Sequence, residues 1–249
     1  MRTGIQVSSL KPLLTTAQQV RTAFERLAGM GCSYVQLQWI DRAVPVEAIA
    51  QSIKETGLHA VSVQDFYTSV RENTAYYIRL NQLTGGQWCC ISRVPEDMRT
   101  PSGMADCVHA FRELERELER KHQKLCFHPV HADYQAYDGL IPVDYLLENM
   151  PEMPLCLDLY HLNRSGRSMT EWIEAHRHRI CMVHYKDEKD GQLVPAGQGD
   201  TDWTGVTEAC VKAGAEYAFV EQETWTRDPF ECLQEALAWL NGQLPEEKK

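Results

Sequence analysis

Short apolar runs alternate with longer amphipathic stretches along the whole chain. The runs are rich in β-branched and aromatic residues and are bounded by turn-forming residues, which is typical of strands buried on both faces. The predicted strands are Ile5–Val7, Tyr34–Leu37, Ala60–Val63, Trp88–Ile91, Leu125–Phe127, Leu155–Leu157, Ile180–Val183 and Tyr217–Val220. The predicted helices between them are Thr16–Met30, Val46–Glu55, Ser69–Leu83, Ser102–His122, Val143–Asn149, Thr170–Ala175, Thr204–Ala213 and Pro229–Leu240.

The number of these units predicts the fold. Eight strand-then-helix units in 249 residues match an α/β fold of the (β/α)₈ TIM barrel type better than an open doubly wound sheet. The sequence has no GxGxxG or P-loop pattern, which argues against nucleotide binding. No repeat or linker divides the chain, so we expect a single domain over residues 1–249. Thr16 is expected to cap the first helix, and Asp228 with Pro229 to open the last one.

Charge and composition narrow the class of protein. The chain has 25 Lys and Arg against 35 Asp and Glu, a net charge of −10, which disfavours nucleic acid as a partner. No apolar run approaches the ~20 residues of a membrane helix, and the N-terminus lacks the apolar core of a signal peptide. We therefore expect a cytoplasmic protein that binds no membrane. The nine cysteines form no C-x-x-C pair and lie mostly in apolar runs, which predicts reduced core thiols.

Polar side chains that bind metals close four consecutive predicted strands. The fifth to eighth strands end in His128, Asp158, His184 and Glu221. Chemistry in such barrels sits at the C-terminal ends of the strands, and adjacent parallel strands lie ~4.8 Å apart. These four side chains are therefore expected to converge on one divalent cation.

The mixture of nitrogen and oxygen ligands indicates which cation to expect. Such a set suits Mn²⁺, Zn²⁺, Co²⁺ or Fe²⁺ better than the all-oxygen cage of Ca²⁺. We expect Mn²⁺, with Zn²⁺, Co²⁺ or Mg²⁺ as alternatives.

Several spaced motifs resemble one known family from end to end. They are GIQVSSL at 4–10, DLYHLNRSG at 158–166, HYKDEKDGQLVPAGQGDTDW at 184–203 and VEQE at 220–223. In this order they resemble the opening strand, the strand-six D-x-x-H motif, the strand-seven H-x-K-D segment with its G-x-G-D-x-D-W loop, and the end of strand eight. The family is the sugar phosphate isomerase/epimerase superfamily, whose members are xylose isomerase-like TIM barrels.

The resemblance implies a function and roles for individual residues. Asp158, His184 and Glu221 would be metal ligands, His161 would help to hold the substrate, and Lys186 would stand near the site. In such relatives the metal stabilises the enediolate formed when the carbon next to a ketone loses its proton. Two groups on opposite faces of the substrate move that proton, and Glu221 would be one of them. The expected substrate is a small carbohydrate or keto-sugar.

The fifth strand end departs from the family pattern. Many relatives carry a Glu there, whereas this chain has FHPVHADYQAYDG at 127–139. His128, His131 and Asp133 remain open as the fourth ligand. We expect His128 to bind the metal, His131 to be the second acid/base and Asp133 to contact the substrate.

Two earlier strand ends depart as well. Gln36 and the Gln64-Asp65 pair stand where relatives often place Glu and His. Neutral amides bind hydroxyl groups without moving protons, so these positions favour an unusual substrate. Trp39, Phe66, Tyr67 and Trp225 follow strand ends, where each either stacks on the substrate or packs in the core.

The leading prediction is a metal-dependent sugar isomerase or epimerase. The nearest alternative is a lyase or dehydratase that uses the same site for β-elimination on inosose-like or 3-keto-glycoside substrates, alone or within a hetero-complex. A DNA endonuclease of the same superfamily fits poorly, because Gln36 and Gln64 replace candidate ligands and the charge is unfavourable. A non-catalytic role is the remaining alternative, and a homo-oligomer is compatible with the sequence.

Overall fold

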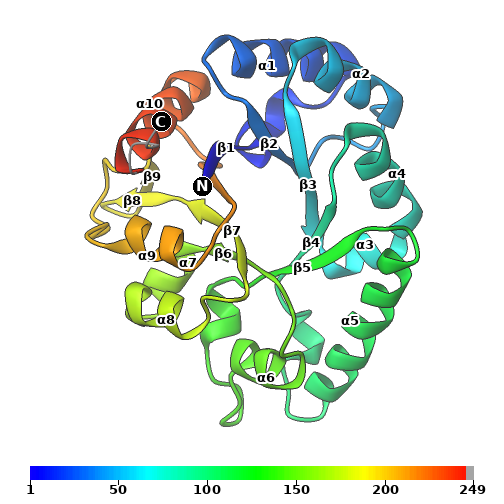
Figure 1. The fold of residues 1–249 in the computed structure, drawn as a ribbon, viewed down its shortest axis with the longest axis vertical. Coiled ribbons are helices and arrows are strands. Elements are labelled where there is room, and N and C mark those ends of the chain that lie inside the picture. Colours follow the sequence, from blue (N-terminus) through cyan, green and yellow to red (C-terminus); the bar gives the residue numbers. More distant parts are fainter. Residues whose placement is uncertain (245–249) are drawn as a thin grey trace.

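Eight parallel strands close into a barrel in the computed structural model, which describes residues 1–244. The strand order around the barrel is β1-β10-β7-β6-β5-β4-β3-β2, with the helices packed around the outside (Figure 1). The strands are β1 Arg2–Gln6, β2 Tyr34–Leu37, β3 His59–Phe66, β4 Trp88–Ser92, β5 Lys124–His128, β6 Leu155–Asp158, β7 Ile180–Tyr185 and β10 Tyr217–Val220. The predicted (β/α)₈ barrel with its eight strands is confirmed. The last five residues of the predicted 1–249 domain lie outside the described part of the chain.

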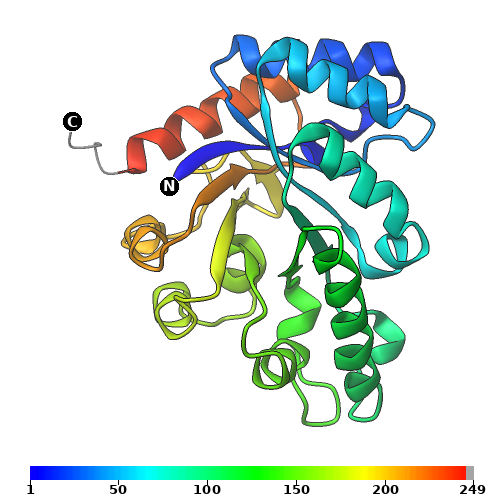
Figure 2. The same cartoon turned by 45° about the vertical axis from the view of Figure 1, so that its right-hand side comes forward.

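Helices follow every barrel strand and form the outer layer seen from two sides in Figures 1 and 2. They are α1 Ala17–Gly29, α2 Val46–Thr56, α3 Tyr67–Glu72, α4 Thr74–Thr84, α5 Gly103–Glu119, α6 Pro142–Asn149, α7 Leu159–Arg164, α8 Met169–Ala175, α9 Val206–Lys212 and α10 Pro229–Gln243. Short 3₁₀ helices cover Val7–Leu13, Glu96–Met98 and His131–Tyr134.

The predicted helix over 69–83 is interrupted at Asn73, which separates α3 from α4. The Asn73 amide donates to the Ser69 carbonyl at 3.1 Å, and the Thr74 hydroxyl to the Val70 carbonyl at 3.0 Å. Side chains that bond to nearby carbonyl groups compete with the helical ladder. The sequence pattern also misses α7, a single short turn of helix directly after β6.

Both predicted helix starts are confirmed. The Thr16 hydroxyl accepts a hydrogen bond from the Gln19 amide at 3.2 Å, and α1 begins at the next residue. Asp228 accepts from the Phe230 amide at 2.8 Å, with Pro229 at the first helical position of α10. These caps satisfy amide groups that have no partner inside the helix.

The register of the barrel places the strand ends at one level. Asp158 on β6 lies opposite His184 on β7, and Ser92 on β4 lies opposite His128 on β5. Below these polar positions the barrel interior is filled by a compact cluster of apolar and sulfur-containing side chains: Val61, Cys90, Cys126, Cys156, Met182 and Phe219. The interior is therefore a packed core, and the ionisable groups described below lie at its C-terminal end.

A hairpin that the sequence pattern does not predict follows β7. It consists of β8, Asp187–Lys189, paired antiparallel with β9, Gln192–Val194. The two turn residues, Asp190 and Gly191, have φ angles of 50° and 76°, as a tight two-residue turn between antiparallel strands requires. The strands are too short for an alternating pattern to stand out in the sequence.

All nine cysteines are free thiols, and eight of them are buried, in agreement with the predicted core role. Among residues 1–244, the helices lack the length and apolar character that crossing a membrane would require.

Candidate metal centre and active site

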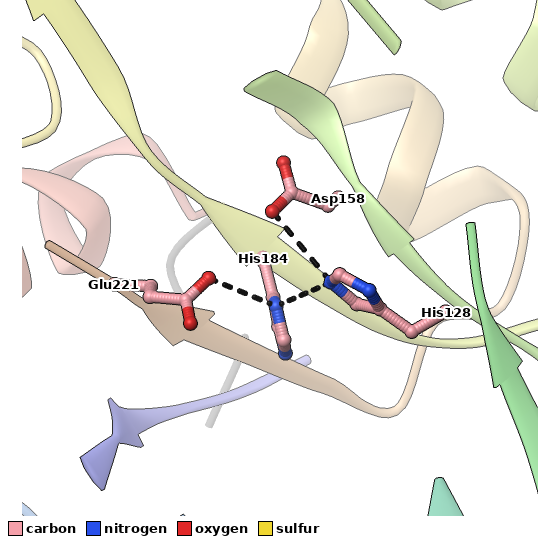
Figure 3. A group of neighbouring side chains, drawn as sticks. All are labelled: His128, Asp158, His184 and Glu221. Atoms are coloured by element: carbon pink, nitrogen blue, oxygen red, sulfur yellow. Dashed lines mark hydrogen bonds and ion pairs between the residues drawn. The ribbon is translucent and has the colours of Figure 1, made fainter. Parts of the chain in front are cut away.

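Four buried side chains meet at the C-terminal end of the barrel. They are His128, Asp158, His184 and Glu221, and each offers one ligand atom within 4.8 Å of the others. His184 Nδ1 lies 3.1 Å from His128 Nε2 and 3.3 Å from Glu221 Oε2, and His128 Nε2 lies 3.6 Å from Asp158 Oδ2. Figure 3 shows the four side chains pointing toward one another from four strand ends. The structure therefore brings together the residues that close the predicted strands five to eight.

The donor set fits a divalent cation. Asp158 Oδ2 is buried and has no hydrogen-bond partner, although burying an unpaired polar atom is costly. Two imidazoles and two carboxylates are also ligands that Mn²⁺, Zn²⁺, Co²⁺ and Fe²⁺ accept. A cation between these side chains would satisfy the Asp158 oxygen and neutralise two buried carboxylates.

Residues of β1, β2 and the 3₁₀ helix that follows β1 orient this cluster. Gln36 on β2 accepts a hydrogen bond through Oε1 from His184 Nε2 at 2.5 Å, which leaves the Nδ1 lone pair facing the cluster. Gln6 on β1 donates to the same Gln36 oxygen at 2.8 Å. Ser8 donates to Glu221 Oε1 at 2.7 Å. The amide at position 36 thus fixes the ring of His184, a role that the sequence analysis did not assign to it.

Lys186 introduces a buried positive charge beside the cluster. Its ammonium lies 3.0 Å from Glu221 Oε2, 3.7 Å from Asp158 Oδ2 and 2.6 Å from Glu223 Oε1. Burial favours the uncharged form of Lys186, but the three carboxylates outweigh burial and raise its pKa. The same ammonium helps to hold the pKa values of Asp158 and Glu221 below their usual range, against the opposing effect of burial. Both carboxylates are therefore ionised and ready to bind a cation.

His161 lies directly above the Asp158 carboxylate. Its backbone amide donates to Asp158 Oδ1 at 3.0 Å, and its Nε2 lies 3.8 Å from Oδ2. Burial lowers the pKa of His161 from 6.5 to about 4, and the positive charge of Lys186 acts in the same direction. The imidazole lines the cavity beside the cluster, and its substrate-binding role stays a prediction.

The two other strand-five candidates lie apart from this cluster. His131 starts a 3₁₀ helix, is half-buried, and contacts Gln135 through Nε2 at 2.9 Å. Asp133 is fully buried and accepts hydrogen bonds from the Val94 amide at 3.1 Å and the Val130 amide at 2.9 Å. Its contacts join the loops after β4 and β5, which favours a structural role for Asp133 over the expected contact with the substrate.

Asp187 organises the loop that follows the hairpin. Its buried carboxylate accepts hydrogen bonds from the Gly197 and Gly199 amides, both at 3.0 Å, and from Trp203 Nε1 at 3.1 Å. A Cβ atom at position 199 would come within 2.2 Å of the Asp187 carboxylate, so this position requires glycine. The H-x-K-D and G-x-G-D-x-D-W segments therefore form one folded unit around a carboxylate.

A cavity of about 500 Å³ opens beside the cluster. It lies between α7, the β8–β9 hairpin and the loop after β10, and its volume is typical of small-molecule sites. Its lining residues are Tyr160, His161, Lys186, Glu188, Gly191, Gln192, Leu193, Glu223, Thr224, Trp225 and Thr226.

The sequence analysis missed Glu223 and Ser8 as residues of the site. Glu223 binds Lys186, lines the cavity and has a second oxygen, Oε2, that is buried without a partner. Its place two residues after Glu221 in VEQE was the available signal. Nothing in the sequence indicated Ser8, because its contact with Glu221 spans 213 positions.

Of the four aromatic residues considered for stacking, Trp225 lines the cavity. Tyr67 is buried against Phe111, with ring centroids 4.9 Å apart. Trp39 and Phe66 lie beside each other, with centroids 6.0 Å apart.

Comparison with known proteins agrees with this fold. The family model described as "Xylose isomerase-like TIM barrel" matches residues 18–243. No curated protein matches the sequence.

Solved structures with the same fold include three named sugar enzymes. A sugar phosphate isomerase/epimerase from Parabacteroides distasonis is 16% identical, with 97% of this chain and 94% of that chain covered and a TM-score of 0.81. The 3-keto-D-glucoside 4-epimerase from E. coli is 20% identical, with coverages of 97% and 99% and a TM-score of 0.70. A D-allulose 3-epimerase from Methylomonas sp. is 17% identical, with both chains 98% covered and a TM-score of 0.72. At these identities the likeness establishes a shared fold.

Proposed function

The chain belongs to the xylose isomerase-like TIM barrel family, and on that premise we propose that it is a divalent-metal-dependent sugar isomerase or epimerase. The observation that carries the proposal is the buried convergence of His128, Asp158, His184 and Glu221 beside a cavity of about 500 Å³. The names of the structural neighbours, which include two sugar epimerases, support the choice of a keto-sugar as substrate. We propose Mn²⁺ as the metal, with Zn²⁺, Co²⁺ or Mg²⁺ as alternatives.

The proposed chemistry is the movement of a proton next to a ketone. A divalent cation held by the four residues would act as a Lewis acid and stabilise the negative charge that develops on the substrate oxygen. Glu221 is the proposed base, because Ser8 holds its Oε1 while Oε2 faces the cluster. His161 and Lys186 bind and orient substrate oxygens from the cavity side.

A second group must return the proton from the other face of the substrate. His131 was expected for this role, and Glu223 is an alternative that only the structure indicates. Each residue has one partner and one buried atom without a partner, but Glu223 lines the cavity and His131 is not among its lining residues. These contacts favour Glu223. The variant Glu223→Gln should therefore abolish product formation, and His131→Gln should leave most of it.

The test of the function is solvent deuterium exchange. Purified protein is loaded with Mn²⁺ and incubated in D₂O with a panel of ketohexoses and 3-keto-glucosides. Metal-dependent incorporation of deuterium at the carbon next to the ketone is expected, and it should disappear with chelator and in Glu221→Gln. Absence of exchange with every substrate, in a protein shown to bind the metal, would contradict the proposal.

A lyase remains the second candidate, and one observation favours it. The fifth strand ends in His128, a proposed metal ligand, so proton return falls to Glu223, and a Glu223 that stays paired with Lys186 would leave the carbanion without a proton donor. Without reprotonation, the same carbanion expels a leaving group from the neighbouring carbon. NMR of the products separates the two reactions, since an epimer keeps all its oxygens and an elimination releases water or an aglycone.

A further inference from the structure

The cavity beside the metal cluster is directly connected to it. Lys186 and His161 line the cavity and also contact the cluster, Lys186 through Glu221 and His161 through Asp158. A substrate with its ketone at the cluster therefore extends into this cavity. The groups on its walls decide which substituents the substrate can carry.

The walls of the cavity are fixed by hydrogen bonds that need no ligand. Gln222 is buried, and its side-chain amide donates to the carbonyl oxygens of Leu193 at 3.2 Å and Thr224 at 2.9 Å. These bonds tie the hairpin to the loop after β10. On the opposite wall, Glu188 accepts from the Tyr160 hydroxyl at 2.7 Å and from Arg164 Nη1 at 3.0 Å. A preformed cavity of this kind selects ligands without a large cost of ordering its own groups.

The charges around the cavity are dominated by carboxylates. Among the described lining residues the cation is Lys186, and Arg164 stands behind the lining residue Glu188; both cations are already ion-paired. The negative groups in contact with them or with the cavity are Asp158, Glu221, Glu223 and Glu188. Two positive and four negative charges leave a net charge of −2. Metal-binding histidines are neutral, so one divalent cation brings the whole site to neutrality.

Lys11 and Arg93 are cations in segments that follow other barrel strands, and neither lines the cavity. Lys11 lies over the ring of Trp39, with Nζ 4.8 Å from its centroid. Arg93 lies over the ring of Phe66, with Cζ 4.0 Å from its centroid. Both belong to the segments that follow β1 and β4, away from the hairpin and α7.

We propose that this cavity selects an uncharged sugar and excludes phosphorylated sugars. The inference rests on the proposed function and specifies its substrate class. A phosphate group would add two negative charges to a site that is neutral with its metal bound. Among the described lining residues, the cation that it would meet is Lys186, which is held by three carboxylates. An uncharged sugar instead offers hydroxyl groups that donate to Glu188 and Glu223, while Trp225 and Tyr160 present aromatic faces to its C–H surface.

The experiment compares the binding of three ketohexoses with that of their 6-phosphate esters. Calorimetric titrations use the full chain loaded with Mn²⁺, and each dissociation constant is an average over the sugar and the epimer that the active enzyme interconverts. At least one ketohexose is expected to bind at least tenfold more tightly than its ester. Equal or tighter binding of the ester would overturn the proposal, and so would a failure of every ketohexose to bind.

Variants of the cavity wall, compared with matched controls, show which residues make the protein prefer the sugar over its phosphate ester. Glu188→Gln removes a negative charge and frees Arg164, so the ester should gain at least threefold in affinity relative to the sugar. Lys11→Gln and Arg93→Gln should leave the ratio unchanged, and a loss of ester binding in either would show that phosphate is recognised elsewhere and would overturn the proposal. Thermal unfolding midpoints show whether each variant is folded. Binding of a ketohexose without deuterium exchange would contradict the proposed function alone, since selection of the uncharged sugar would persist.

Discussion

The two halves of the barrel mouth are built from different chemistry. Near their C-terminal ends, β5, β6, β7 and β10 present His128, Asp158, His184 and Glu221. The corresponding positions of β1 to β4 present the neutral groups Gln6, Gln36, Gln64 and Ser92, all buried.

The neutral groups bind one another. Gln6 donates to Gln36 at 2.8 Å, and Gln64 donates to Ser92 at 3.1 Å. The ionisable groups of the other half form ion pairs with each other, and Asp158 Oδ2 has no hydrogen-bond partner. Gln64 keeps one buried oxygen, Oε1, without a partner, but burying a neutral polar atom costs far less than burying a charge, so the carboxylates of the other half require a compensating cation. One half of the mouth therefore carries the charged groups of the proposed metal site, and the other half holds them in position. Gln36 and Ser8 connect the two halves through hydrogen bonds to His184 and Glu221.

The largest expected effect comes from removing a member of the charged half. His184→Ala should abolish tight binding of one Mn²⁺ per chain and lower deuterium exchange by at least about a thousandfold. Elemental analysis after dialysis and the exchange assay measure the two losses. The exposed His178 provides the control, because His178→Ala removes the same side chain away from the cluster. Retention of one tightly bound metal by His184→Ala would refute the assigned centre.

An intermediate effect is expected from the pH dependence of His161 in metal-free protein. Its folded-state pKa of about 4 lies below the ordinary value of 6.5. The unfolded chain therefore takes up a proton first as the pH falls. The difference in pKa contributes about 3 kcal/mol to the free energy of unfolding. This contribution is fully present above pH 6.5 and is lost as the pH falls from 6.5 to 4.

His161→Gln should remove this contribution. Denaturant unfolding between pH 7 and 4 should show the wild type losing stability relative to His161→Gln as the pH falls. The exposed His178→Gln variant should follow the wild type. Parallel curves for wild type and His161→Gln would show that the ring of His161 is not protected from protonation in the folded state.

The smallest expected effect tests the link between the halves. Gln36→Met removes the acceptor that orients His184 and should weaken Mn²⁺ binding by about 10–100-fold. Gln64→Met is the matched control, because Gln64 is also a buried amide but bonds to Ser92. Calorimetric titration of Mn²⁺ measures both variants. Equal affinities in the two variants would reduce Gln36 to a packing role.

The fold was predictable because its signals are local. Each barrel strand contains a short apolar run, and most of the long helices have an amphipathic spacing that neighbouring residues reveal without knowledge of contacts. The interruption at Asn73, the turn α7 and the β8–β9 hairpin were missed, since each depends on a few hydrogen bonds in a short segment.

The candidate site was predictable in part. The residue types at the ends of the predicted strands five to eight were visible in the sequence, and parallel strands in a barrel bring such ends to one level. The choice among His128, His131 and Asp133 was not decided by spacing. It depends on where β5 stops and the following 3₁₀ helix turns away.

The sequence by itself determined the barrel, its strand ends and the kinds of ligand that those ends carry, because all of these follow from patterns within a few adjacent residues. Only the tertiary structure decided that Gln36 orients His184 across 148 positions, that Lys186 lies among three carboxylates, and that a cavity opens under the hairpin. Closure of the barrel creates these contacts, and the distances between side chains depend on the register of all eight strands together.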